Sequence, residues 1–116
     1  CLCNTSAETN MIVTKAGPDM QLCFDTNHLL KETPEQFLAN FKGKIAAIHV
    51  SDYDYIDEKH WIPYQGKCDW NSIVKELLRH EYDEVFMFES SKLNDGSVAP
   101  WPQIIGTWQR MKKEYK

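Results

Sequence analysis

Short apolar runs separated by amphipathic stretches predict an alternation of strands and helices along the chain. Runs at 20–24, 45–50 and 85–88 predict three strands. The middle run is nearly continuous and is interrupted only by His49, which favours a strand buried on both faces. Strands of that kind occur mainly in parallel sheets.

Four stretches around these runs carry helix signals. One helix is expected to begin near Ser6, and the last to cover 103–115. Thr33 and Asp69 are the predicted N-caps of the two middle helices, and Pro34 suits a first helical position. The order helix, strand, helix, strand, helix, strand, helix predicts parallel β/α units, so the expected fold class is α/β.

The segment 51–68 stands out as a long aromatic and polar connection, with Pro63 and Gly66 as breakers. A connection of that length inside a compact domain is usually functional or disordered. Its tryptophan and tyrosine residues argue against disorder. We therefore expect an ordered loop with a function.

Composition and charge narrow the possible partners. The chain has 116 residues, of which 42% are hydrophobic, enough for one domain with a core. Its net charge of −4, from 13 basic and 17 acidic residues, offers no basic surface for a nucleic acid. A run of about 18 apolar residues, as a membrane helix requires, does not occur, so we expect no membrane partner.

The cysteines suggest a compartment and raise a question about the start of the chain. No Cys-x-x-Cys spacing occurs, so we expect a reducing, cytoplasmic location, with Cys23 as a small core residue. Residue 1 is Cys1 instead of Met, which a lipidated N-terminus, another cleavage or a piece of a longer chain would explain. The patterned segment follows without a flexible tether, which favours the piece of a longer chain.

Each predicted strand ends in a residue that can bind a metal ion. These residues are Asp25, His49 and Glu89. Because the carboxyl ends of parallel strands meet at one edge, the three side chains could converge on one ion. Carboxylates with one imidazole suit Mn²⁺, Mg²⁺, Co²⁺ or Zn²⁺. Individually, Asp25 could cap a turn, His49 could be a core histidine, and Glu89 could be a solvated or paired surface residue.

Further polar and aromatic residues lie near these strand ends. His28 and Asp52 each follow a candidate ligand by three residues. Each could lie at the same end of the sheet and form hydrogen bonds that orient the metal ligands. His60 lies in the long loop and could cover the site, or it could be an exposed loop residue. The aromatic residues Trp61, Tyr64 and Trp70 could line a pocket or anchor the loop.

Four segments, in this order, resemble motifs of the sugar phosphate isomerase/epimerase family, the xylose-isomerase-like TIM barrels. An Asp-Thr-x-His segment is resembled by Leu22-Cys23-Phe24-Asp25-Thr26-Asn27-His28, and a His-x-x-Asp strand end by Ile48-His49-Val50-Ser51-Asp52. The segment from His60 to Trp70 resembles a Pro-Gly-x-Gly-x-x-x-Trp loop. The fourth segment, Phe86-Met87-Phe88-Glu89, resembles a closing strand with a terminal Glu.

The resemblance implies a (β/α)₈ barrel that binds a divalent metal through two Glu, one Asp and one His. Asp25, His49 and Glu89 would be three of the four ligands. Glu89 would also act as one of two acid/base carboxylates, at the carbon beside a sugar carbonyl. His28 would contact a substrate oxygen, and His60 occupies the place where ketose epimerases often have Arg. The implied substrate is a small sugar or sugar phosphate.

The sequence departs from the family pattern at two points. Tyr64 stands where the first Gly of the loop motif is expected, so the loop could adopt another shape. The second catalytic Glu belongs to a strand that would end just before Cys1. We therefore expect residues 1–116 to be the C-terminal part of a TIM barrel, its last three β/α units. This part is expected to be inactive alone and to need homo-oligomerisation or the missing N-terminal segment.

Other activities use related sites. An inosose-dehydratase-like lyase of the same fold would share the ligand set. Zinc-dependent abasic-site endonucleases need more His ligands and a basic DNA-binding face, which the sequence does not indicate. A non-catalytic carbohydrate- or metal-binding module is favoured slightly by Tyr64 and by the absent Glu.

Overall fold

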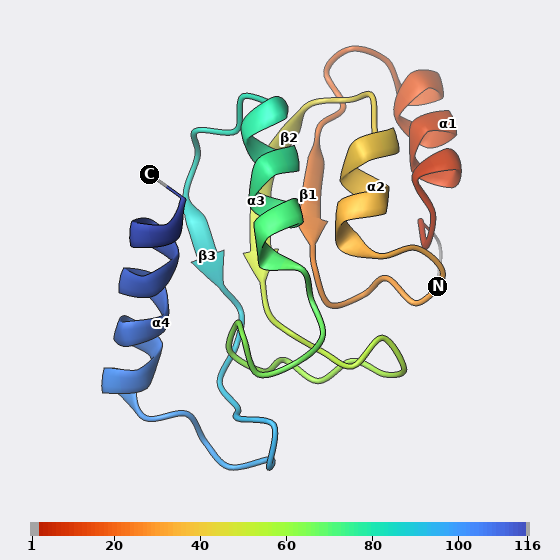
Figure 1. Ribbon diagram of the computed structural model, residues 1–116. Coiled ribbons are helices and arrows are strands. Elements are labelled where there is room, and N and C mark those ends of the chain that lie inside the picture. The colour runs from red at the N-terminus through yellow and green to blue at the C-terminus, as the bar shows by residue number, and fades with distance from the viewer. Residues whose placement is uncertain (1–2, 116) are drawn as a thin grey trace.

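A computed structural model of the chain describes residues 3–115. Cys1, the residue that led us to expect a piece of a longer chain, lies outside the described residues. Strands β1 (Leu22–Asp25), β2 (Ile45–Val50) and β3 (Phe86–Phe88) form one parallel sheet in the order β1-β2-β3. The three arrows in Figure 1 point the same way, so the carboxyl ends of the strands lie at one edge. The predicted α/β fold with parallel β/α units is confirmed.

Four helices accompany the sheet. They are α1 (Ser6–Ala16), α2 (Pro34–Asn40), α3 (Trp70–Arg79) and α4 (Trp101–Glu114). Figure 1 shows α2 and α3 side by side across one face of the sheet, with α1 beyond α2 and α4 beside β3. Every predicted helix is present, within two residues of its expected start.

Local hydrogen bonds explain where these helices begin. At α2, the Thr33 hydroxyl accepts from the N–H of Gln36 while the Gln36 side chain accepts from the N–H of Thr33. At α3, a carboxylate oxygen of Asp69 accepts from the N–H of Ser72 at 3.1 Å. At α1 the cap is Thr5 instead of Ser6, because the Thr5 hydroxyl accepts from the N–H of Glu8.

The core lies between the sheet and the helices. On the sheet it is formed by alternate strand residues, Phe24, Ile48 and Val50, all at most 2% exposed. The helices cover these residues with large apolar side chains, of which the buried ones are Phe37, Leu38, Trp70, Ile73, Leu77 and Met111. Burial of this apolar surface holds the strands in parallel register against α2 and α3.

The opposite face of the sheet is less covered. In the strand register, Asp25, His49 and Met87 form one row across this face. Cys23, two residues before Asp25 in β1, lies on the same face. Cys23 is exposed, so its predicted place in the core was wrong: strand alternation turns it away from buried Phe24. On this face, Ala47 and His49 of β2 are only partly buried, so β2 is not buried on both faces as expected.

The loop from Ser51 to Asp69 joins β2 to α3 and lies at the carboxyl edge of the sheet (Figure 1). Within residues 3–115, no helix is long and apolar enough to cross a membrane.

Candidate metal centre

The ends of the three strands bring Asp25, His49 and Glu89 together. Nδ1 of His49 lies 2.7 Å from Oε2 of Glu89 and 3.7 Å from Oδ2 of Asp25. Asp25 and His49 are register partners, and the backbone N–H of Glu89 donates to the carbonyl of Val50 at 3.0 Å. Each of the three offers a ligand atom, and these atoms lie within 4.8 Å of one another. The position predicted from the strand ends is where the side chains converge.

The two carboxylates of this group are electrostatically unequal. Burial raises the pKa of Asp25. The hydrogen bond from the N–H of Asn27 and the charge of His28 offset part of that rise, whereas the adjacent charge of Glu89 raises the Asp25 pKa further. Glu89 is more exposed; desolvation alone would raise its pKa, but hydrogen bonds with Asp25 and His49 and the charge of His49 bring its pKa below the ordinary value. Of the two carboxylates, Asp25 therefore binds a proton more readily than Glu89 does. A divalent cation fits here, because two carboxylates and an imidazole offer ligand atoms within 4.8 Å of one another.

His28 joins this group to a second one. Its Nε2 lies 3.3 Å from Oδ2 of Asp25, and its Nδ1 lies 2.7 Å from Oε1 of Glu58. Partial burial lowers the pKa of His28, but the hydrogen bond to Glu58 and the charges of Asp25, Glu58 and Glu89 raise it overall. The ring is thus held between two carboxylates.

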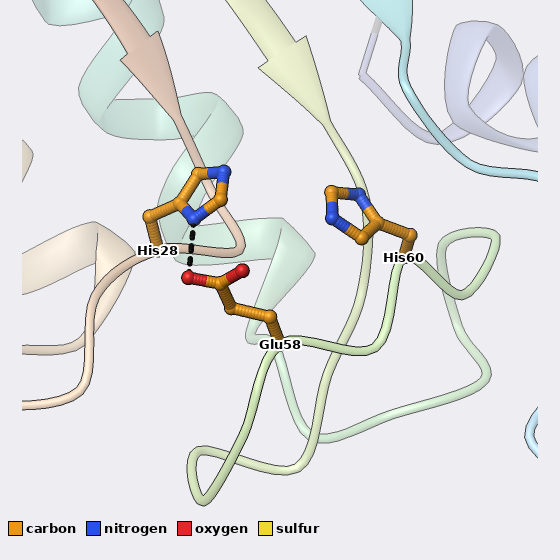
Figure 2. A group of neighbouring side chains, drawn as sticks. All are labelled: His28, Glu58 and His60. Atoms are coloured by element: carbon orange, nitrogen blue, oxygen red, sulfur yellow. Dashed lines mark hydrogen bonds and ion pairs between the residues drawn. The ribbon is translucent and has the colours of Figure 1, made fainter.

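His60 completes the second group from the other side. Its Nδ1 lies 3.2 Å from the backbone carbonyl of Glu89, and its ring stands edge-on to that of His28, with ring centroids 5.8 Å apart. Figure 2 shows Glu58 rising from the loop between the two imidazoles. Ligand atoms of His28, Glu58 and His60 lie within 4.8 Å of one another. Sequence reasoning missed Glu58, although its spacing from His60 in Glu58-Lys59-His60 could have indicated it.

Two buried residues after β1 hold the loop in this position. Oδ1 of Asn27 accepts from the backbone N–H groups of Lys59, at 3.0 Å, and of His60, at 3.3 Å. The Thr26 hydroxyl donates to the carbonyl of Ser51 at 2.6 Å and accepts from its N–H at 3.0 Å. The loop that carries Glu58 and His60 is therefore tied to the end of β1, beside Asp25.

Asp52 has a different role from the one predicted. It was expected to support the metal from the mouth, but it is fully buried and organises the loop. Its carboxylate accepts from the N–H groups of Tyr53, Tyr64 and Cys68 and from Nε1 of Trp70, all at 2.9–3.0 Å. These four donors compensate its desolvated charge.

The loop packs tightly around Asp52 at Gly66. A methyl group at Gly66 would overlap Oδ1 of Asp52 and the backbone carbonyl of Tyr53. Only glycine fits so close an approach. Gly66 therefore lets the loop close over the buried carboxylate.

The aromatic residues anchor the loop. Trp70 is buried in the core, and Trp61 pairs with Asp52 through two backbone hydrogen bonds. Tyr64 has φ of 71°, a left-handed conformation that glycine adopts most easily, at the position where the motif has Gly. Its hydroxyl donates to Glu114 at 2.8 Å, and the Arg110 guanidinium lies 3.6 Å from its ring centre.

Comparison with known proteins decides the family. Residues 1–112 match the family described as xylose isomerase-like TIM barrel. The chain belongs to this family. The predicted resemblance is confirmed, and the three parallel strands with their helices form part of a TIM barrel of the xylose isomerase-like type.

One solved structure and one curated protein are similar to this chain. The crystal structure of a D-tagatose 3-epimerase-like protein superposes with a TM-score of 0.72 at 19% identity, over 98% of this chain and 41% of that one. At that identity the likeness concerns the fold. The uncharacterized protein y4fM of Sinorhizobium fredii (strain NBRC 101917 / NGR234) is 25% identical over 71 residues, 60% of this chain and 23% of that protein. The chain thus spans less than half the length of either.

Proposed function

We propose that this chain supplies part of the active site of a sugar or sugar phosphate isomerase or epimerase. The observation that carries the proposal is the convergence of Asp25, His49 and Glu89 at the carboxyl ends of adjacent strands. TIM-barrel enzymes place their chemistry at this end of the barrel. The xylose isomerase-like family and the D-tagatose 3-epimerase-like structure support a sugar as the substrate class.

The proposed cofactor is a divalent metal ion held by Asp25, His49 and Glu89. Two carboxylates with one imidazole suit Mn²⁺, Mg²⁺, Co²⁺ or Zn²⁺. When bound, the ion would polarise the sugar carbonyl and stabilise the negative charge that develops on its oxygen. The family pattern adds a second Glu, which residues 1–116 do not supply at a matching position. We accordingly propose that residues 1–116 form the C-terminal part of one barrel domain.

The proton transfer is assigned to Glu89. Its carboxylate is half exposed and therefore within reach of a substrate. In this role it removes the proton from the carbon beside the carbonyl. A proton returned to the opposite face of that carbon gives the epimer, and one returned to the neighbouring carbon gives the aldose or ketose isomer. His28, which contacts Asp25, and His60, which contacts the backbone of Glu89, would hold substrate oxygens during the transfer.

Exchange of carbon-bound hydrogen with solvent tests the proposal. The full-length barrel that contains residues 1–116 is purified and incubated in D₂O with Mn²⁺ and each of a panel of ketohexoses and their phosphates, and deuterium at the carbon beside the carbonyl is followed by NMR. We expect exchange with at least one sugar, lost on addition of a chelator. Glu89→Gln should reduce the rate by at least about 10²-fold, the contribution of a positioned acid/base group.

Glu84→Gln is the matched control, because Glu84 is an exposed carboxylate just before β3, at the opposite end of that strand. It should leave the exchange rate unchanged. Metal-independent exchange, or equal rates in wild type and Glu89→Gln, would contradict the proposal. Binding of a ketose without any exchange would support a non-catalytic binding module instead.

A further inference from the structure

A polar cavity lies beside Glu89, where the connection from β3 to α4 begins. Its volume is about 490 Å³, and the residues that line it are His60, Phe88, Glu89, Ser90, Ser91 and Lys92. The last three have no part in the function proposed above. We propose that this cavity binds an anionic substituent of the substrate, a phosphate or a carboxylate, and that Lys92 selects it. The inference rests on the proposed function, because Glu89 acts on the carbonyl end of the same sugar.

Lys92 supplies the positive charge that an anionic group requires. Its side chain is exposed and lines the cavity. The ion pairs formed within residues 3–115 do not include it. Lys59, a lysine of the neighbouring loop, differs in this respect, because its Nζ lies 3.8 Å from Oδ2 of Asp54 and 3.5 Å from Oδ2 of Asp57. The ammonium of Lys92 is therefore available to an anion, whereas that of Lys59 is already paired.

The hydroxyl of Ser90 is a buried donor without a partner. Its Oγ is shielded from solvent and forms no hydrogen bond with any of the described residues. A buried hydroxyl that stays unpaired costs free energy, so such an atom calls for an explanation. Because no hydrogen bond holds it, rotation to another staggered position can direct this hydroxyl into the cavity that Ser90 lines. An anion in the cavity would accept a hydrogen bond from it.

Backbone hydrogen bonds hold the segment that carries these residues. The N–H of Ser91 donates to the carbonyl of His60 at 3.2 Å, and the N–H of Ile62 donates to the carbonyl of Lys92 at 2.9 Å. The carbonyl of Ser91 also accepts from the N–H of Ala99 at 2.9 Å. In Figure 1 this segment runs beside the loop between β2 and α3. The backbone is thus ordered before a ligand binds, which reduces the entropy lost on binding.

The position of Lys92 relative to Glu89 suits a small sugar with an anionic end. Lys92 follows Glu89 by three residues, so their Cα atoms lie at most about 11 Å apart. A ketose held with the carbon beside its carbonyl at Glu89 would extend its far end along this segment. Oε2 of Glu89 lies 2.7 Å from Nδ1 of His49, and in the proposed centre Glu89 also binds the metal ion. Its charge is then compensated and does not repel the anion.

Substrate preference tests the anion site. The full-length barrel that contains residues 1–116 is loaded with Mn²⁺, and hydrogen exchange in D₂O gives kcat/KM for ketohexoses, their phosphates and ketohexuronates. We expect a phosphate or a uronate to exceed its parent sugar at least about tenfold, and the two sets identify the anion. Lys92→Met should lower this ratio at least about tenfold, the contribution of a hydrogen bond to a charged group. Lys44→Met is the matched control, because Lys44 is an exposed lysine just before β2, at the opposite edge of the sheet, and it should leave the ratio unchanged.

Binding of unreactive anions separates this inference from the proposed function. Sorbitol 6-phosphate and gluconate have no carbonyl, and calorimetric titration of the same protein gives their dissociation constants. Lys92→Met should weaken the binding of at least one of them about tenfold, and Ser90→Ala about threefold. If exchange occurs but neither the substrate preference nor the anion affinity changes in Lys92→Met, the anion site is refuted and the proposed function stands. If no sugar exchanges but Lys92→Met weakens anion binding, the anion site stands and the proposed function fails.

Discussion

At the scale of single residues, His28 is the point at which the two groups of side chains meet. It contacts Asp25 through one ring nitrogen and Glu58 through the other. His60 adds a second link, because it contacts the backbone of Glu89. A change in the position of the loop would therefore alter both groups together. The residues that fix the loop, Asn27 and Asp52, are positioning residues for the whole centre.

Gly66 provides a residue-scale test of this loop. Gly66→Ala would place a methyl group against the Asp52 carboxylate and the Tyr53 carbonyl, neither of which can move without breaking buried hydrogen bonds. We expect the free energy of unfolding to fall by about 1–3 kcal/mol, as for an overpacked interior. Urea denaturation followed by circular dichroism measures it.

Gly106→Ala is the matched control, because Gly106 lies within α4 and a methyl group there meets no atom within 4 Å. Helix propensity predicts a gain of about 0.5–1 kcal/mol at this position. Equal effects of the two substitutions would refute the close approach at Gly66.

The candidate ligands could be predicted from the sequence, but their support could not. Asp25, His49 and Glu89 follow from a general property of parallel sheets, whose carboxyl ends share one edge. The contacts of Glu58 and Asn27 depend on the path of the long loop, which brings residues about thirty positions apart into hydrogen-bond range. Local pattern does not contain that path.

At the scale of elements, the caps of the two middle helices and the bounds of β2 were predicted correctly, whereas the first strand and the last helix are displaced. Thr33 and Asp69 cap the helices they were expected to cap, because a side-chain cap is a local interaction. The first predicted strand, 20–24, is instead Leu22–Asp25, because hydrogen bonding to β2 decides its extent. The final helix begins at Trp101, earlier than expected, since Pro102 is tolerated in a first turn.

The Asp69 cap makes helix α3 sensitive to pH. Hydrogen bonds from the hydroxyl and N–H of Ser72 hold the pKa of Asp69 below its ordinary value. A lowered pKa in the folded state means that the cap contributes fully above the ordinary value, near pH 4, and is lost as pH falls through the folded value. We expect Asp69→Ala to lower the free energy of unfolding by about 1 kcal/mol at neutral pH and by less under acid conditions.

Asp69→Asn separates the cap from other acid effects, since asparagine caps helices without titrating. Thermal or urea denaturation at several pH values gives the differences from wild type. A cost of Asp69→Ala that stayed constant as pH fell below the folded pKa would contradict this assignment.

At the scale of the whole molecule, the described residues form one side of a barrel. Helices cover the face of the sheet that carries Phe24 and Ile48, and the other face carries His49 and Met87 in one row. In a closed TIM barrel the second face points into the interior, and the ends of its strands surround the active site. The candidate centre lies at those ends, where groups from further strands of a closed barrel would join its three candidate ligands.

The central claim is that Asp25, His49 and Glu89 bind a divalent metal at this edge of the sheet. Anomalous diffraction from crystals of the protein equilibrated with Mn²⁺ measures it most directly. We predict a manganese peak about 2–2.3 Å from a carboxylate oxygen of Asp25 and of Glu89 and from a ring nitrogen of His49. A well-ordered strand edge without a manganese peak among these three residues would contradict the account.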